Sequence, residues 1–130
     1  MNSEKDFLAQ KRFAVVGAST DRTKYGNKVL RCYLQHGREV VPVNPKDATV
    51  EGLAAVKSLG DIHPRPDAIS IITPPKVTEA VVEEAGRLGI HHVWMQPGAE
   101  SDAAIARAKA LGMNVIAGGP CLLVVLGFRD

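Results

Sequence analysis

The stretch that most constrains the fold of this chain runs from residue 12 to residue 27. A continuous apolar run over residues 13–16 ends at Gly17, and a loop of small and polar residues separates it from the helical spacing of apolar side chains that follows. Apolar runs of this length are typical of strands buried on both faces of a parallel sheet. The stretch therefore predicts a strand, a loop and a helix, in which the loop has the shape of a phosphate-binding turn.

The same alternation of strand and helix continues along the chain. Each predicted helix ends at a glycine (Gly37, Gly89 or Gly112), as expected for a left-handed C-terminal cap. The predicted strands are residues 13–16, 39–43, 68–72, 92–95 and 115–117. Strands that alternate with helices are joined by right-handed crossovers. We therefore predict a single α/β domain over residues 1–130, a Rossmann-like, doubly wound parallel sheet of about five strands in the order 3-2-1-4-5.

Other segments are less regular. Residues 3–10 predict a short helix that packs its apolar side chains onto the body of the domain. Residues 47–67 predict an irregular segment with one helical turn around residues 56–62. Residues 122–130 are apolar as far as Gly127, so they predict either a last element on the sheet or part of a subunit contact.

Composition excludes several classes of partner. The 130 residues are 45% hydrophobic and 23% charged, as in ordinary globular domains, and the net charge of +2 is too small to indicate nucleic acid or an anionic membrane. No apolar run reaches the roughly 18 residues that a membrane span needs. The polar start, residues 1–6, resembles neither a signal peptide nor a transit peptide. Cys32 and Cys121 show no disulfide or metal spacing, so we expect a cytoplasmic protein without a metal site.

The carboxyl ends of the strands are where an open parallel sheet binds its ligands. After the first strand, the N–H groups and the dipole of the following helix favour an anion. Glycines let the backbone come close there, and polar or basic side chains add donors and charge; these residues are Gly17, Ser19, Arg22, Lys24, Gly26 and Asn27. The alternative is a plain connection in which glycine only relieves crowding, because Ser19 stands where G-x-G-x-x-G has its second glycine.

The residues at the end of the second strand indicate which kind of nucleotide cofactor the domain can bind. NAD-binding domains usually place Asp or Glu there for the ribose hydroxyls, whereas this chain has Asn44, Pro45 and Lys46. A cation suits a ribose phosphate, such as the 3′-phosphate of coenzyme A or the 2′-phosphate of NADP. A solvated surface lysine is the alternative for Lys46.

The third strand is followed by Thr73, Pro74 and Pro75, which open a helix. Proline is tolerated in the first helical turn, and two proline rings give a rigid apolar wall against an adenine or a pantetheine arm. Simple helix initiation is the alternative, and the same stretch occurs in nicotinamide-dependent oxidoreductases.

The side chains at this edge do not include a catalytic base. His36 lies at a helix end, His63 lies in a turn, and His91 and His92 open a strand at the opposite edge. Cys121 is the only potential nucleophile at the ligand edge, and a small buried apolar residue is the alternative. We therefore expect a binding module without catalytic residues rather than an enzyme.

Short motifs accompany these strand ends. They are Val16-Gly17-Ala18-Ser19, Lys24, Gly26, Val41-Pro42-Val43-Asn44-Pro45, Ser58-Leu59, Pro74-Pro75, Val93-Trp94-Met95-Gln96, Gly98 and Cys121. Over residues 12–121 the motifs resemble the small stand-alone CoA-binding proteins, which are similar to the CoA-binding domains of the succinyl-CoA synthetase α subunit and of the ADP-forming acyl-CoA synthetases. The resemblance implies a Rossmann-like fold that binds coenzyme A or an acyl-CoA, but it does not imply ligase activity.

The resemblance also implies roles for residues at each strand end. The first loop would cradle the pyrophosphate, residues 44–46 would hold the adenosine end, and residues 73–77 would line its other side. Gln96 and Gly98 would lie towards the pantetheine arm. The candidate ligand-binding residues are Gly17, Ala18, Ser19, Arg22, Lys24, Tyr25, Gly26, Asn27, Val43, Asn44, Pro45, Lys46, Thr73, Pro74, Pro75, Val77, Gln96 and Gly98.

This chain departs from the family pattern at two places. Many relatives carry Phe-Arg where this chain has Ile72-Thr73, and Asp-Arg-Cys where Gly119-Pro120 precede Cys121. Both departures remove an arginine from the pocket edge, which implies a weaker affinity for coenzyme A or a different ligand. The alternative function is an NAD(P)-binding redox-sensing or oxidoreductase-like domain. A homo-oligomer or a partner subunit stays open in either case.

Overall fold

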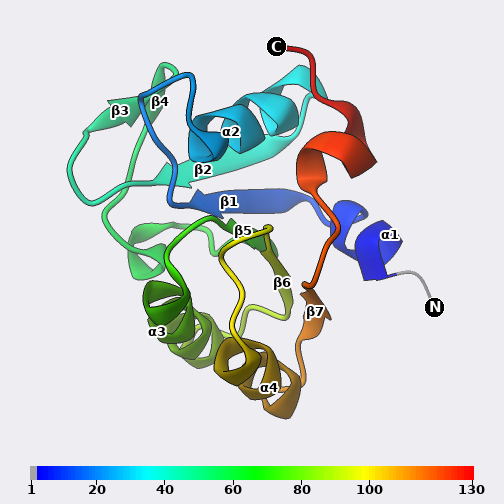
Figure 1. The fold of residues 1–130 in the computed structure, drawn as a ribbon. Helices are drawn as coiled ribbons and strands as arrows, with labels where there is room; N and C mark the ends of the chain where they lie inside the picture. The colour runs from blue at the N-terminus through cyan, green and yellow to red at the C-terminus, as the bar shows by residue number, and fades with distance from the viewer. Residues whose placement is uncertain (1–2) are drawn as a thin grey trace.

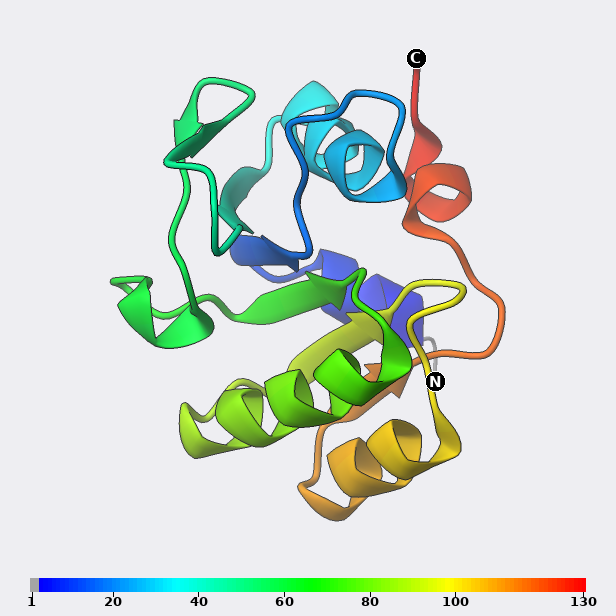
Figure 2. The ribbon, with the colours of Figure 1, turned by 60° about the vertical axis from the view of Figure 1, so that its left-hand side comes forward.

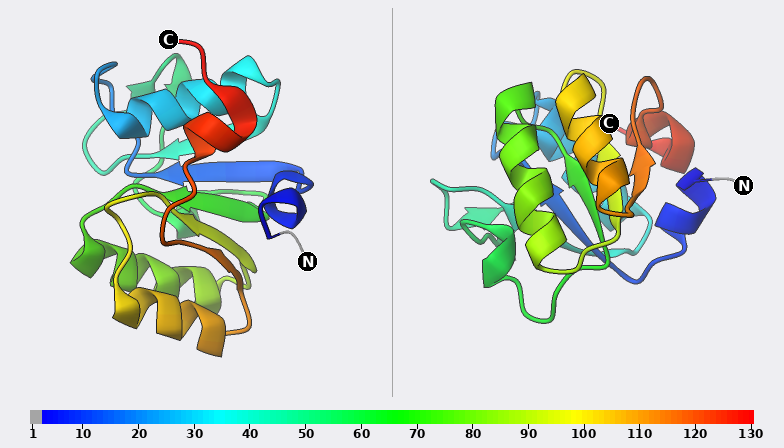
Figure 3. Two further views of the ribbon diagram at one scale, coloured as in Figure 1. Left: turned by 45° about the vertical axis from the view of Figure 1, so that its right-hand side comes forward. Right: turned by 90° about the horizontal axis from the view of Figure 1, so that it is seen from below.

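The computed structural model describes residues 3–130, so residues 1–2 of the polar start lie outside the described chain. Its centre is a five-stranded parallel sheet covered by helices on both faces (Figures 1 and 3). The strands are β1 (Arg12–Val16), β2 (Glu39–Val43), β5 (Ala68–Ile71), β6 (His92–Met95) and β7 (Asn114–Ile116). The helices are α1 (Ser3–Leu8), α2 (Tyr25–Gln35), α3 (Pro75–Arg87) and α4 (Asp102–Ala110). The predicted Rossmann-like α/β sheet is confirmed.

The predicted strand order was wrong. The observed order is β2-β1-β5-β6-β7, which corresponds to 2-1-3-4-5 in order of appearance, because β5 pairs with β1. The strand β2 is therefore an edge strand. Pro42 lies within it, and proline has no N–H to donate to a second neighbour. The outer edge of β2 pairs with the single residue Val56, whose N–H donates to the Pro42 oxygen at 3.1 Å and whose oxygen accepts from the Asn44 N–H at 2.8 Å.

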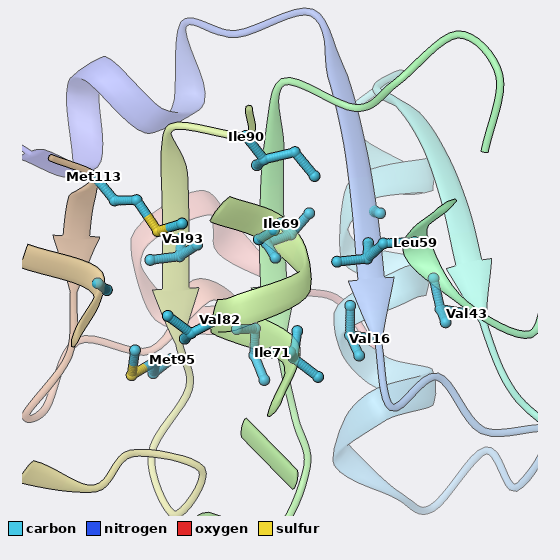
Figure 4. Close-up of a cluster of buried hydrophobic side chains, with 14 of the residues drawn as sticks. Val16, Val43, Leu59, Ile69, Ile71, Val82, Ile90, Val93, Met95 and Met113 are labelled. Carbon is cyan, nitrogen blue, oxygen red and sulfur yellow. The ribbon is translucent and has the colours of Figure 1, made fainter. Parts of the chain in front are cut away.

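Apolar side chains pack on both faces of the sheet, which explains the continuous apolar strands. On the face covered by α3 and α4, Ile69 and Val93 pack against Val82 (Figure 4). On the other face, the ring of Phe7 in α1 meets the ring of Trp94 edge-on, with 5.3 Å between the ring centroids. Phe7 is fully buried, so the predicted packing of the first helix is confirmed.

The segment predicted to be irregular contains a hairpin. The strands β3 (Thr49–Val50) and β4 (Leu53–Ala54) pair antiparallel around Glu51 and Gly52. These two residues have φ values of 50° and 77°, as the type I′ turn of tight hairpins requires. In Figure 2 the hairpin stands clear of the sheet, on the α2 side. The predicted helical turn is present as a 3₁₀ turn, Leu59–Asp61, but the hairpin was missed.

The tail after β7 packs along α2 (Figure 3, left). It forms a π-helical turn, Leu123–Gly127. His36 Nε2–H at the end of α2 donates to the Gly127 oxygen at 2.6 Å. The tail is thus a last element that packs beside α2 on one face of the sheet, where Leu122 is fully buried in the same apolar cluster as Trp94 and Ile116. Val124 and Val125 are exposed, and a subunit contact there stays a prediction.

The N-terminus of α4 gives a modest stability prediction. Ser101 Oγ caps this helix, because it accepts a hydrogen bond from the Ala104 N–H at 3.0 Å. We expect Ser101→Ala to lower the free energy of unfolding by about 1 kcal/mol, because a first-turn N–H loses its partner. Urea unfolding measures this change. Ser58→Ala is the control and should cost less than about 0.5 kcal/mol, since Ser58 Oγ makes no cap hydrogen bond at the 3₁₀ turn and donates instead to the exposed Asp61 Oδ2 at 3.2 Å. Equal losses in both variants would contradict the capping role.

Two kinds of feature are absent from residues 3–130. None of the helices there combines the length and the apolar character needed to cross a bilayer. In the same part of the chain, no cluster of three or more His, Cys, Asp or Glu side chains is arranged to hold a metal ion.

Candidate functional site

A groove of about 790 Å³ lies at the carboxyl ends of β1, β2 and β5. The strand order reverses between β1 and β5, and such a switch point is where open α/β sheets bind their ligands. The lining residues come from the three loops that follow these strands and from the start of α2. They are Gly17, Ala18, Ser19, Thr20, Asp21, Lys24, Tyr25, Gly26, Asn44, Pro45, Lys46, Asp47, Ile72, Thr73 and Pro74.

The groove contains 11 of the predicted site residues and leaves out seven. Those outside its lining are Arg22, Asn27, Val43, Pro75, Val77, Gln96 and Gly98. Thr20, Asp21, Asp47 and Ile72 line the groove but were not predicted. All four directly neighbour predicted residues in the sequence, so loop position was the signal that could have identified them.

The N-terminus of α2 forms one wall of the groove. Its cap residue, Lys24, makes no side-chain hydrogen bond to the first turn, and the first intrahelical bond is that of Lys28 to the Lys24 oxygen. The N–H groups of Tyr25 and Gly26 therefore have no partner within residues 3–130, and both residues line the groove. Unpaired N–H groups and the helix dipole together favour an anion at this wall.

Two glycines allow this helix to sit close to the end of β1. Gly17 has a φ of +95°, and a Cβ there would lie 2.1 Å from the Ile72 oxygen. A Cβ on Gly26 would lie 2.0 Å from the Gly17 oxygen. Both glycines therefore relieve crowding inside the protein, as the plainer of the two sequence interpretations held. The same close packing fixes the position of the free N–H groups at the groove.

The first loop is held by its own side chains. Ser19 Oγ accepts from the Asp21 N–H at 3.0 Å, and Asp21 Oδ1 accepts from Thr23 Oγ1 at 2.6 Å and from the Thr23 N–H at 2.9 Å. The side-chain hydrogen bond from Thr23 is the main reason why the pKa of Asp21 is lowered. Asp21 therefore stays ionised and places a negative charge on the groove wall beside Lys24.

The buried side chain of Asn27 makes its hydrogen bonds within the protein, so it is not available to a ligand. Its Nδ2 donates to the Ser19 oxygen at 2.8 Å and to Glu51 Oε2 at 3.0 Å, and its Oδ1 accepts from Arg31 Nε at 2.6 Å. Arg22 is engaged by the same hairpin carboxylate, with 2.8 Å between Arg22 Nη1 and Glu51 Oε1. Two expected donors thus tie the loop to the β3–β4 hairpin, and their partner Glu51 was not predicted.

The loop after β2 forms the second wall. Asn44 Oδ1 accepts the N–H groups of Lys46 at 2.7 Å and of Asp47 at 2.8 Å, and its Nδ2 donates to the Ala18 oxygen at 3.0 Å. The Asn44 side chain therefore shapes the loop and joins it to the first one. Lys46 is exposed and makes no salt bridge within the described chain. Asp47 lines the groove, so the prediction of no carboxylate near this strand end was wrong.

The third wall comes from the loop after β5. Thr73 Oγ1 is hydrogen-bonded to Thr78 Oγ1 at 2.8 Å, and Pro74 is the cap residue of α3. Pro75 is the first residue of that helix and does not line the groove, while Val77 is 47% exposed on α3. Of the two prolines, Pro74 can form a rigid wall and Pro75 initiates the helix.

Tyr25 connects the groove to a buried polar cluster beyond it. The Tyr25 hydroxyl donates to Gln96 Oε1 at 3.0 Å and lies 2.5 Å from Cys121 Sγ. Gln96 is fully buried, and its Oε1 also accepts from the Leu122 N–H at 2.9 Å. Burial is the main cause that raises the pKa of Tyr25, so the phenol stays protonated. Gly98 lies in the loop after β6, where its N–H donates to Glu100 Oε1 at 2.9 Å.

Comparisons with known proteins show which families and structures this chain is similar to. Residues 11–127 match a family described as a CoA binding domain. The α subunit of ADP-forming acetate–CoA ligase II from Pyrococcus furiosus is 33% identical over 88 residues, which are 67% of this chain and 19% of that subunit. An uncharacterised protein, YneT of Bacillus subtilis, is 30% identical over 106 residues, or 82% of this chain and 78% of YneT. A conserved hypothetical protein of Pyrococcus furiosus has a similar structure, with a TM-score of 0.83 and 37% identity over 88% of this chain and 98% of that one.

Proposed function

Because the chain belongs to the family of CoA-binding domains, we propose that it binds coenzyme A or an acyl-CoA in the groove at the ends of β1, β2 and β5. The observation that carries the proposal is the uncapped N-terminus of α2, because Tyr25 and Gly26 there have unpaired N–H groups and both residues line this groove. A diphosphate is the part of the coenzyme that suits such a site.

With the diphosphate at the N-terminus of α2, the positions of the other parts of the coenzyme would follow. Lys24 lies at the N-terminus of α2 and Lys46 on the facing loop, and both are exposed and line the groove. Lys46 would meet the 3′-phosphate, while the rings of Pro45 and Pro74 would flank the adenine. The pantetheine arm would then run past Tyr25. Asp21 and Asp47 offset part of the positive charge, so we expect weaker binding than in a site lined by arginines.

The proposed role is that of a binding, carrier or regulatory module. The chain spans only 19% of the ligase subunit that it matches, so the ligase activity of that protein is not part of the proposal. Asp47 supports a second candidate, because a carboxylate near the end of the second strand can accept hydrogen bonds from the ribose hydroxyls of a nicotinamide cofactor.

A thermal-shift titration with coenzyme A, acetyl-CoA, NAD and NADPH, under reducing conditions, tests the proposal. At about 100 times its dissociation constant, a ligand stabilises the native state by about 2.7 kcal/mol, which raises the melting temperature by several degrees. We expect this shift with coenzyme A and acetyl-CoA and none with NAD or NADPH. A larger shift with NAD or NADPH would favour the second candidate, and no shift with any compound would contradict both.

A further inference from the structure

Tyr25 brings the groove into contact with a thiol that the proposed binding function does not use. Its hydroxyl lies 2.5 Å from Cys121 Sγ, and the tyrosine itself lines the groove. Cys121 is partly exposed. Gly118 and Gly119 precede it, and a Cβ on either glycine would meet no atom within 4 Å. The loop that carries Cys121 is therefore uncrowded at these two glycines.

A buried donor without a partner lies in the same cluster. Gln96 Nε2 has no hydrogen-bond partner within residues 3–130, although the side chain is fully buried. The orientation of the amide is fixed, because the Leu122 N–H can only donate and therefore faces Oε1. Buried donors in native structures are nearly always hydrogen-bonded, so an unpaired one indicates an acceptor from outside the protein. The carbonyl oxygen of a ligand amide would supply one, and the pantetheine arm of coenzyme A carries two amides.

We propose that Cys121 is a thiol-exchange site, which forms a mixed disulfide with the thiol end of coenzyme A held in the groove. The inference rests on the proposed function, since the groove would deliver the coenzyme arm to the cluster of Tyr25, Gln96 and Cys121. The co-reactant is the symmetrical disulfide of coenzyme A. The product is a reversible, oxidised form of the protein that keeps one coenzyme covalently in place.

The exchange balances without a further oxidant. The Cys121 thiolate attacks one sulfur of the coenzyme disulfide, so that a new S–S bond forms and the old one breaks. The departing coenzyme thiolate takes up the proton that Cys121 gave up. The Tyr25 hydroxyl, which donates to Gln96 Oε1 while the thiol is protonated, can turn to donate to the thiolate. The raised pKa of Tyr25 keeps that proton available.

The second cysteine provides a matched control within the same chain. Cys32 is fully buried, and its Sγ donates to the Gly127 oxygen at 3.7 Å. Burial raises the pKa of Cys32 to about 11, with the nearby Cys121 as a lesser cause. A thiolate is therefore scarce at Cys32, and no ligand reaches it.

Intact-protein mass spectrometry tests the exchange. Reduced protein is incubated with coenzyme A disulfide, glutathione disulfide or cystamine. We expect one coenzyme adduct that dithiothreitol removes, forming about tenfold or more faster than the other adducts because docking raises the effective concentration of the disulfide. Cys121→Ser should abolish the adduct, and Cys32→Ser should leave its rate unchanged. Tyr25→Phe should slow the reaction severalfold even with cystamine, which does not need the groove.

Three results would overturn the inference: equal rates for coenzyme A disulfide and cystamine, an adduct on Cys32, or an internal Cys32–Cys121 disulfide in place of the adduct. The thermal-shift titration under reductant separates this failure from that of the binding proposal. If reduced coenzyme A stabilises the protein but no adduct forms, only the exchange is wrong. If reduced coenzyme A does not stabilise it, the binding function itself is wrong.

Discussion

Reversing the charge of Lys46 should weaken the binding of coenzyme A by about tenfold or more at an ionic strength of about 0.1 M, and should weaken dephospho-coenzyme A by less than about threefold. A charge-assisted hydrogen bond is worth about 1.5–3 kcal/mol, and about 1.4 kcal/mol corresponds to a tenfold change in affinity. Lys46 lines the groove and has no salt bridge within residues 3–130, so Lys46→Glu disturbs no internal ion pair. Isothermal titration calorimetry with both ligands measures the difference.

Lys109→Glu is the matched control for this experiment. Lys109 lies in the last turn of α4, which leads to the opposite edge of the sheet. The same change in net charge should therefore alter both affinities by less than about twofold, since charges farther apart than the Debye length of about 10 Å are largely screened. Equal losses of coenzyme A and dephospho-coenzyme A in Lys46→Glu would show that Lys46 does not contact the 3′-phosphate.

Adding a single methyl group at Gly26 should lower the free energy of unfolding by about 3 kcal/mol. The new Cβ would lie 2.0 Å from the Gly17 oxygen, which is backbone and cannot rotate away. The first turn of α2 must then move away from β1, although Val29, Leu30 and Tyr33 on the same helix are fully buried. Overpacking of this kind typically costs about 1–3 kcal/mol. We expect the upper end of that range here, because the obstacle is a backbone atom.

Gly60→Ala is the control for Gly26→Ala, and urea unfolding compares the two. Near Gly60 the added Cβ would meet only Glu84 Oε2, at 3.7 Å, which is an ordinary contact. We expect a change below about 0.5 kcal/mol there. If Gly26→Ala were as stable as Gly60→Ala, α2 would not pack this closely on the first loop. For the same reason a replacement of Gly17 reports on folding as well as on binding.

Much of the site could be predicted because parallel strands place their carboxyl ends at one edge. Residues that follow three different strands, such as Gly17, Asn44 and Thr73, were expected to meet and do line one groove. The strand order could not be obtained from apolar runs, since a buried strand looks the same beside either neighbour. Pro42 within β2 was the available signal, because it favours an edge position.

The roles of individual side chains were harder to predict. Asn27 and Arg22 follow the first strand, yet both turn to Glu51 on the hairpin. That hairpin depends on positive φ values at Glu51 and Gly52, and Glu-Gly is a weaker signal for such a turn than Asn-Gly. The sequence did not indicate that Glu51 lies beside the first loop. It therefore could not predict that the side chains of Asn27 and Arg22 point towards Glu51.

In the proposed complex, the phosphates of coenzyme A bind to the free N–H groups at the start of α2. A titration of ¹⁵N-labelled protein with coenzyme A, followed through the backbone amide signals, tests this contact. We predict that the largest shifts belong to the amides of Tyr25 and Gly26, with smaller ones over residues 44–47. Saturable shifts confined to the hollow lined by Gln35, His36 and Phe128, or no shifts at all, would contradict the claim.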